Sequence, residues 1–352
     1  MTVNEKKYNI LVIGKTGVGK SSFVNYFLGQ DVAKTGTGKP VTERGFHEFS
    51  FAMEGFPVIL YDSWGLEADK YQEWTEKFSV ELKQRGVDKP ATKWFHSVFY
   101  CIAAGGHRVE DADIEIIRLL QQEKYPVSVV LTKCDMIDAD QEEKMKSSLK
   151  AALGNINAIS MSSGGKNRSG PIEPFGIEAI RQQAKDDFFS SIAMRIPDHL
   201  RAYLRKELAE WKDLVDREIQ QVGYFDMREI QKKVEGINKK YIPLITNAVK
   251  GELEDILKIY NKAMSIAGIP LHEDRNPKKK NMNYSWVEYL MFIPIALPVM
   301  GYMLVSGAKE KNKERLQEYF DDKHQEVGRK MLGWIDKVEE NLISLRNNMH
   351  GS

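Results

Sequence analysis

The chain has 352 residues, more than one minimal domain needs and enough for two, because domains usually hold about 100–200 residues. Its 51 Lys and Arg nearly balance its 50 Asp and Glu, so it lacks the basic excess of proteins that coat nucleic acid. Both cysteines, Cys101 and Cys134, lie in apolar runs, which argues against a disulfide framework and for a reducing, cytoplasmic compartment. The polar start, Met1 to Lys7, predicts no signal peptide.

Strand and helix patterns alternate through the first half of the chain. Short apolar runs predict strands at 8–13, 46–51, 57–61, 95–103, 127–132 and 157–161. Amphipathic or helix-forming segments predict helices at 20–28, 69–83, 111–122 and 140–153. This alternation is typical of an α/β fold in which helices cover a mostly parallel sheet.

The second half is dominated by helix formers. We therefore expect two domains, 1–196 and 197–352. Apolar stripes recur at helical spacing within 204–222 and 320–345. They predict two long helices that pack on each other, as an all-α helical bundle or stalk.

A glycine-rich motif lies between the first predicted strand and helix. It reads Gly14-Lys15-Thr16-Gly17-Val18-Gly19-Lys20-Ser21 and fits G-x-x-x-x-G-K-[ST]. Glycines let backbone N–H groups turn inward toward phosphate oxygens, and the helix adds its positive N-terminal end. Lys20 would reach the β- and γ-phosphates, and Ser21 would bind Mg²⁺. We count the whole motif and Ser22 as candidate nucleotide-binding residues.

Two later motifs follow predicted strands. In Asp62-Ser63-Trp64-Gly65, Asp62 can hold Mg²⁺ through water, and the N–H of Gly65 can meet a γ-phosphate. In Thr132-Lys133-Cys134-Asp135, the last carboxylate can accept two hydrogen bonds from guanine, a pair that adenine does not offer. The stem of Lys133 can lie over the base. Together these motifs favour GTP over ATP.

These motifs resemble those of P-loop GTPases of the translation-factor-related class. The resemblance is nearest to the Era- and septin-like group, with its immunity-related and dynamin-like branches. It implies that Thr42 is the switch I residue that binds Mg²⁺ and senses the γ-phosphate, with Thr35 and Thr37 as competitors. It implies catalytic roles for Lys20, Thr42 and Gly65, and metal binding by Ser21, Thr42 and Asp62. For the loop that contacts the base, Ser162 and Ser163 are candidates, and a plain Ser/Gly loop is the alternative.

The chain departs from the family pattern at several positions. Leu66 stands where Ras-type members carry a water-orienting glutamine, so we expect slow intrinsic hydrolysis, accelerated by a partner or by dimerisation across the nucleotide face. Gly17 stands where potassium-using members carry an asparagine, and Thr132 replaces a common asparagine. Arg44 and His47 could supply charge or a proton path, and surface roles are the alternative.

One apolar segment, 286–308, needs its own explanation. Its part from Tyr289 to Ala308 has no charged residue and is about long enough to cross a hydrocarbon core as a helix. Basic residues flank both sides, at 275–280 and 309–313, and Pro298 would kink the segment. We favour a hairpin that dips into a membrane from the cytoplasmic side. A buried core helix and a spanning helix are the alternatives.

The sequence thus predicts a GTPase that binds GTP or GDP with Mg²⁺ and hydrolyses GTP to GDP and phosphate. Its nucleotide state would be coupled to a C-terminal helical domain that contacts a membrane surface. The predicted partners are guanine nucleotide, that membrane surface and a GTP-dependent homodimer, and nucleic acid is not expected. The alternatives are an Era-like switch that docks on a protein or ribonucleoprotein assembly, and a non-hydrolysing GTP-binding scaffold.

Overall fold

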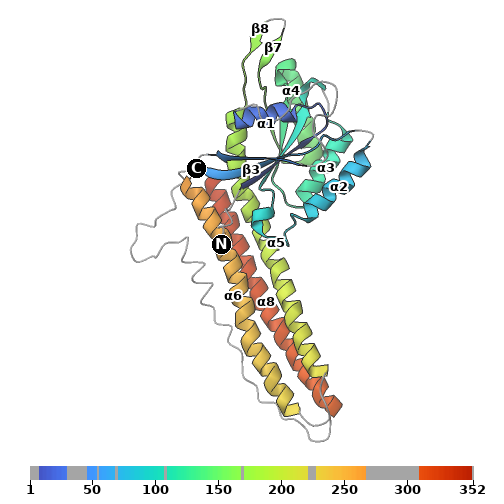
Figure 1. The fold of residues 1–352 in the computed structure, drawn as a ribbon, viewed down its shortest axis with the longest axis vertical. Helices are drawn as coiled ribbons and strands as arrows, with labels where there is room; N and C mark the ends of the chain where they lie inside the picture. Colours follow the sequence, from blue (N-terminus) through green and yellow to red (C-terminus); the bar gives the residue numbers. More distant parts are fainter. Residues whose placement is uncertain are drawn as a thin grey trace. The chain divides into compact units, whose positions relative to one another are not determined.

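A computed structural model describes the chain at residues 8–29, 46–53, 55–67, 70–106, 109–167, 170–220, 227–266 and 309–350. The chain divides into two compact units, Met1–Arg195 and Ile196–Ser352 (Figure 1). Thr42 and the apolar segment 286–308 lie outside the described residues, so the expectations attached to them stay predictions.

The first unit is built on a six-stranded sheet in the order β2-β3-β1-β4-β5-β6. Only the β2–β3 pair is antiparallel in this sheet, and the other neighbours are parallel. Central strands β1 and β5 are buried along their whole length, which explains why their sequences read as continuous apolar runs. The strands are β1 (Tyr8–Gly14), β2 (His47–Met53), β3 (Phe56–Asp62), β4 (Ser97–Ala103), β5 (Val127–Thr132) and β6 (Asn157–Ser160).

Helices cover both faces of this sheet. Side chains of α2, α3 and α4, such as Phe78, Ile117 and Leu149, join one apolar core with residues of β1, β4 and β5. On the other face, Phe23 of α1 packs on Phe99 of β4 with ring centroids 5.6 Å apart. The first part of α5 covers this second face too, because Phe188 meets the ring of Tyr8 at 5.0 Å. The bounds are α1 (Lys20–Leu28), α2 (Tyr71–Lys83), α3 (Asp111–Gln122), α4 (Ala139–Leu153) and α5 (Ile177–Gln220).

The predicted α/β fold with a mostly parallel sheet is therefore confirmed. The structure adds a small hairpin, β7 (Gly165–Asn167) with β8 (Gly170–Ile172), in a stretch for which the sequence predicted no element. Its strands are three residues each and rich in glycine and polar residues, so they carry no apolar alternation to detect.

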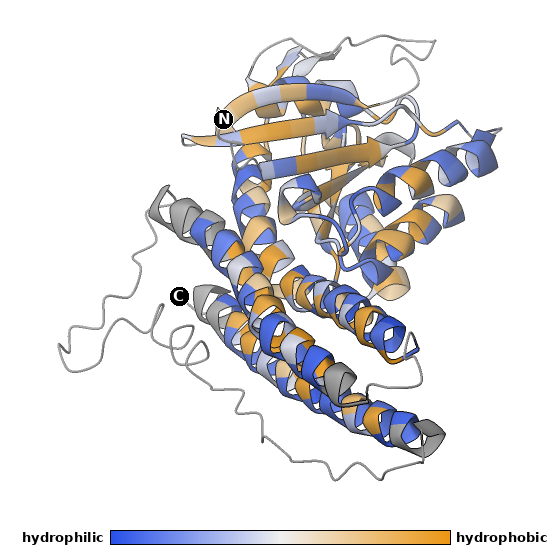
Figure 2. Ribbon diagram, turned by 60° about the horizontal axis from the view of Figure 1, so that its bottom comes forward, coloured by the Kyte–Doolittle hydropathy of each residue, from blue (hydrophilic) through white to orange (hydrophobic). Residues whose placement is uncertain are grey.

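The second unit consists, in its described part, of the end of α5 with α6 (Met227–Ile266) and α8 (Lys309–His350). Figure 2 shows apolar and hydrophilic residues alternating along these helices, as an amphipathic bundle requires. Trp211 of α5 is fully buried and packs edge-on against Phe320 of α8, with ring centroids 5.3 Å apart. Its indole Nε1 donates to Asn238 Oδ1 of α6 at 3.1 Å, so one side chain joins the helices.

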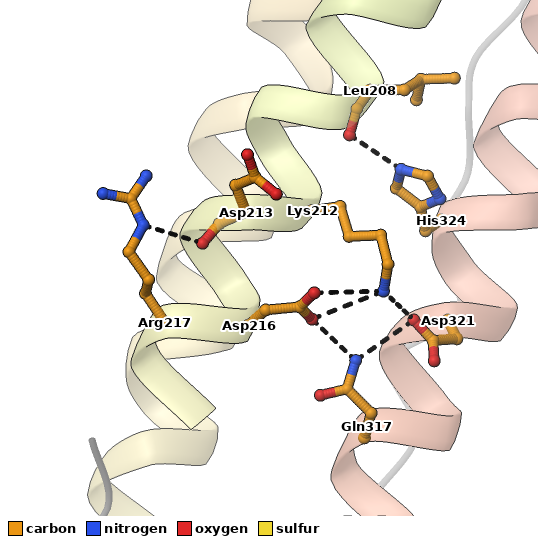
Figure 3. A network of polar contacts seen from close by, with 8 residues as sticks. All are labelled: Leu208, Lys212, Asp213, Asp216, Arg217, Gln317, Asp321 and His324. Carbon is orange, nitrogen blue, oxygen red and sulfur yellow. Dashed lines mark hydrogen bonds and ion pairs between the residues drawn. The ribbon is translucent and has the colours of Figure 1, made fainter. Parts of the chain in front are cut away.

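Polar contacts between α5 and α8 flank this apolar core (Figure 3). Lys212 Nζ lies 2.8 Å from Asp321 Oδ1 and 3.3 Å from Asp216 Oδ2. Gln317 Nε2 donates to Asp216 Oδ1 at 2.8 Å, and His324 Nε2 lies 2.9 Å from the carbonyl oxygen of Leu208. These side chains lie about one helical turn apart on each helix, so they fix the register of α5 against α8.

The two predicted apolar stripes do pack on each other, but the prediction of two long helices missed α6. Pro243 lies inside α6, and glycines occur at 236 and 251. Proline and glycine have low helix propensity, so the sequence of this segment does not predict a helix. In the folded chain, packing on α5 and α8 outweighs that low helix propensity. Within the ranges described above, no helix combines the length and the apolar character that crossing a membrane would take.

Candidate nucleotide-binding site

Three sequence motifs meet at one edge of the sheet. Residues 14–21 follow β1, residues 62–66 end and follow β3, and residues 132–135 end and follow β5. These strands are parallel members of one sheet, so their carboxyl ends lie on the same side. In open α/β sheets this edge is where ligands bind.

The glycine-rich loop has a backbone that side chains would hinder. Gly17 and Gly19 adopt φ of 79° and 98°, in the left-handed region that favours glycine. A Cβ on Gly14 would come closer than 3.0 Å to the carbonyl oxygen of Cys101. Helix α1 starts at Lys20, and within the described chain its N-terminus has no side-chain cap. The positive end of α1 is thus presented to the loop, where an anion would be stabilised.

Lys20 and Asp62 are buried together beneath this loop. Lys20 is 7% exposed, and its Nζ donates to the carbonyl oxygens of Gly14 at 2.9 Å and Lys15 at 3.0 Å. Burial lowers the pKa of Lys20, and the charge of Asp62 opposes that shift. Asp62 is 2% exposed, and burial raises its pKa to about 6, against the opposing effect of Lys20 and His47.

One carboxylate oxygen of Asp62 lacks a hydrogen-bond donor. Among the described residues, its Oδ1 finds no hydrogen-bond partner. A buried carboxylate oxygen without a donor is costly unless a ligand compensates it. Oxygen ligands of this kind suit Mg²⁺, so the residues present fit a magnesium-bound phosphate.

The segment after β3 is pinned to the glycine-rich loop by its backbone. Thr16 N donates to Leu66 O at 3.1 Å, and Leu66 N donates to Gly14 O at 3.3 Å. A Cβ on Gly65 would come closer than 3.0 Å to both Oγ1 and Cα of Thr16, so only glycine fits there without a shift. The Leu66 side chain is 3% exposed and belongs to the core, and it therefore cannot orient a water molecule.

The 132–135 motif is tied to the same loop. Thr132 Oγ1 donates to the carbonyl oxygen of Val18, and Lys133 Nζ donates to that of Gly17 at 2.8 Å. Lys133 has a φ of 56°, a left-handed conformation that is uncommon outside glycine. Asp135 follows in a short 3₁₀ turn and is exposed. The carboxylate of Asp135 is thus available to a ligand at the end of the motif away from the sheet.

Of the two candidate serines after β6, only one has an exposed side chain. Ser162 is 1% exposed, its Oγ accepts from Gly164 N at 3.2 Å, and its N–H donates to Phe175 O. Ser163 is exposed. The loop itself is joined to the 132–135 motif, because Cys134 N donates to Met161 O at 3.1 Å.

Lys15 directs its side chain away from the glycine-rich loop. Its Nζ lies 2.8 Å from Glu110 Oε2 and 2.9 Å from Asp113 Oδ2, at the start of α3. The glycine-rich motif predicts that Lys15 belongs to the phosphate cradle, and no pattern in the sequence indicates either acid. Asp113 is 98 residues away along the chain, and no motif marks it.

The remaining candidates divide between described and undescribed residues. His47 starts β2 and pairs in register with Asp62, which places the two residues as cross-strand neighbours. Ser21 and Ser22 lie in the first turn of α1 and are partly buried. Thr35, Thr37, Thr42 and Arg44 lie outside the described residues.

The mostly parallel sheet, with its glycine-rich loop between β1 and α1, is that of an α/β P-loop GTPase domain, and a helical region follows it. The family model described as "50S ribosome-binding GTPase" matches residues 9–133.

Curated relatives match less than half of the chain. GTPase Der of Dinoroseobacter shibae is 31% identical over 152 residues, which is 43% of this chain and 29% of the relative. The tRNA modification GTPase MnmE of Treponema denticola is 31% identical over 150 residues, which is 40% of this chain and 29% of the relative. The chain thus spans less than a third of the length of either relative.

Solved structures give weaker likenesses. Toc33 from Arabidopsis thaliana shares 18% identity at a TM-score of 0.40, over 52% of this chain and 84% of that one. Era from Aquifex aeolicus, solved with GDP and AlF4⁻, shares 19% identity at a TM-score of 0.39, over 51% and 56% of the two chains.

Proposed function

We propose that this chain binds GTP and GDP together with Mg²⁺ and hydrolyses GTP to GDP and phosphate. The observation that carries the proposal is the pair Lys20 and Asp62, both buried beneath the glycine-rich loop at the carboxyl edge of the sheet. The contacts from Thr132 and Lys133 to the same loop support one continuous surface for phosphates and base.

Each part of the nucleotide would be held by a different element. The loop N–H groups of 14–19 and the ammonium of Lys20 would bind phosphate oxygens, and Asp135 would accept hydrogen bonds from guanine. Ser21, Thr42 and Asp62 would hold Mg²⁺, which when bound neutralises charge on the phosphates. The N–H of Gly65 and the backbone of Thr42 would report whether a γ-phosphate is present.

We propose that hydrolysis is slow without a partner or a second copy of the chain. Leu66 is buried in the core and offers no polar group to an attacking water. Phosphate release measured over a series of protein concentrations tests this. A rate per molecule that rises with concentration supports activation by dimerisation, and no release at any concentration supports a non-hydrolysing scaffold.

Base selectivity is the sharpest test of the nucleotide assignment. Asp135→Asn should weaken GTP binding and favour xanthosine triphosphate, because the amide cannot accept two hydrogen bonds from guanine. Asp140→Asn, an exposed acid in the first turn of α4, is the matched control and should leave selectivity unchanged. Lys20→Ala should abolish nucleotide binding. Unchanged selectivity of Asp135→Asn in titration calorimetry would reject the base assignment.

We further propose that the nucleotide state acts on the second unit and that residues 286–308 contact a membrane surface. The support is in the sequence: the part at 289–308 is apolar and carries no charged residue, and basic residues flank it on both sides. Co-sedimentation with anionic and neutral liposomes, using GTP, GDP or no nucleotide, tests it. Full-length chain and a chain lacking 286–308 are compared. Binding by neither, or equally by both, contradicts membrane contact through this segment.

The family description favours a second candidate, docking on a ribonucleoprotein assembly. The net charge of +1 gives it no electrostatic support. Co-sedimentation with ribosomal particles at two salt concentrations distinguishes the candidates, since docking on RNA falls steeply as salt rises.

A further inference from the structure

The buried carboxylate of Asp113 forms an ion pair with Lys15 of the glycine-rich loop. Asp113 of α3 is 4% exposed. Its Oδ1 accepts from Tyr100 OH at 2.8 Å, and its Oδ2 accepts from Lys15 Nζ at 2.9 Å. Oδ2 also accepts from the backbone N–H of Glu110 at 3.1 Å, which caps α3. A carboxylate this deeply buried is tolerated because its charge is paired and its oxygens are bonded.

The backbone of Lys15 also contacts two other parts of the site. Its carbonyl oxygen accepts from Lys20 Nζ at 3.0 Å. The residue forms a parallel bridge with Leu66, flanked by the hydrogen bonds of Gly14 and Thr16 to that leucine. Lys15 therefore contacts three parts of the proposed site: the Lys20 ammonium, the segment after β3 and the start of α3.

The start of α2 is held to the same helix. Tyr71 OH donates to Glu115 Oε2 of α3 at 2.6 Å. Helix α3 thus contacts both the glycine-rich loop, through Asp113, and the helix that follows the 62–66 segment, through Glu115. Such contacts let a rigid element hold two loops in a fixed relation.

We infer that Lys15 is a positioning residue, whose side chain anchors the glycine-rich loop to α3 and does not bind phosphate. The inference rests on the proposed function, because the loop that Lys15 holds is the proposed phosphate cradle. The anchor keeps the carbonyl oxygens of Gly14 and Lys15 where Lys20 needs them. Its loss loosens the cradle and speeds release of nucleotide.

A direct phosphate contact by Lys15 makes the opposite prediction for Asp113. If Lys15 anchors the loop, Asp113→Asn removes the buried half of this link, leaves Lys15 only its exposed partner Glu110, and must change the release rate in the same direction as Lys15→Met. If Lys15 binds phosphate, Asp113→Asn weakens the hold of α3 on its ammonium, and release becomes slower or stays the same.

The experiment measures dissociation of a fluorescent GDP analogue from the full chain in the presence of Mg²⁺. We expect Lys15→Met and Asp113→Asn each to raise the dissociation rate about tenfold. The double variant should add little to Lys15→Met, since that substitution already removes the Lys15–Asp113 ion pair. Lys15→Arg should have a dissociation rate close to that of wild type, because a guanidinium can pair with the carboxylate.

Lys77→Met is the matched control. It removes an exposed ion pair with Glu73 on α2 and should leave the rate unchanged. Equal rates for wild type and Lys15→Met overturn the inference, and so does a double variant whose effect is the product of the single effects. If Lys15→Met does not fold, a slower or unchanged rate for Asp113→Asn overturns it. A wild-type chain that retains no GDP means that the proposed function itself fails, and this inference with it.

Discussion

Asp187 of α5 is a carboxylate buried behind the sheet, far along the chain from any motif. Its oxygens accept from Ser97 Oγ at 2.6 Å and from Gln183 Nε2 at 2.7 Å. Burial nevertheless outweighs these bonds and raises its pKa from 3.8 to about 7. Because the folded pKa lies above the unfolded one, its contribution to stability is complete below pH 3.8 and is lost as pH rises through about 7.

Asp187→Asn should therefore flatten the pH dependence of the unfolding free energy between pH 4 and pH 8. At pH 8 the variant should be more stable than wild type, because no charge is buried. Urea unfolding of both proteins at several pH values measures this, and the difference between them cancels the effects of other titrating groups. Parallel profiles would show that Asp187 does not titrate in this range.

Gly65 is a residue whose identity is set by backbone contact. Gly65→Ala forces a Cβ against Thr16, and we expect a loss of about 1–3 kcal/mol in the unfolding free energy, with weaker GTP binding. Gly106→Ala is the control, since the described residues leave open space around its Cβ. Thermal unfolding and GTP titration measure the two effects. Equal melting temperatures for the two variants would contradict the crowding argument.

How far the site could be predicted differs from residue to residue. Residues 14–21, 62–65 and 132–135 come together because parallel strands deliver their carboxyl ends to one edge, which the alternating pattern already indicates. Glu110 and Asp113 could not be predicted, because no spacing rule links them to Lys15 across the chain. The roles assigned to all these residues stay predictions.

At the scale of elements, buried apolar runs and amphipathic stripes were enough to predict the sheet and most helices. They failed where the local sequence opposes the element. Pro243 argues against the interior of α6, and the glycines at 165 and 170 hide the β7–β8 hairpin. Helix α6 depends on tertiary contacts, such as that of Asn238 with Trp211, and no local pattern records them.

The packing of α5, α6 and α8 depends strongly on Trp211. Trp211→Ala removes a fully buried indole and leaves Asn238 without this donor, so we expect a loss of about 3–5 kcal/mol from the stability of the second unit. Leu332→Ala is the control, because Leu332 of α8 is 36% exposed and should cost less. Urea unfolding followed by far-UV circular dichroism measures both. Similar losses for the two variants would contradict the central role of Trp211.

At the scale of the whole molecule, one helix contributes to both units. The boundary between the units falls inside α5, at Arg195 and Ile196. Ile180 and Phe188 are buried in the first unit, and Leu204 and Trp211 are buried in the second. This continuity of the chain is the covalent route by which a change of nucleotide state in the first unit would act on the second.

Coupling between the units has a thermodynamic consequence that calorimetry can measure. A ligand that binds only the folded first unit stabilises it by about 2.7 kcal/mol at 100 times its Kd. If the units are coupled as we propose, GDP with Mg²⁺ must also shift the unfolding transition of the second unit, by linkage. Trp211→Ala identifies that transition, because the substitution lowers it directly. A second transition that stays fixed while the first one rises would show that nucleotide binding does not reach the helical bundle.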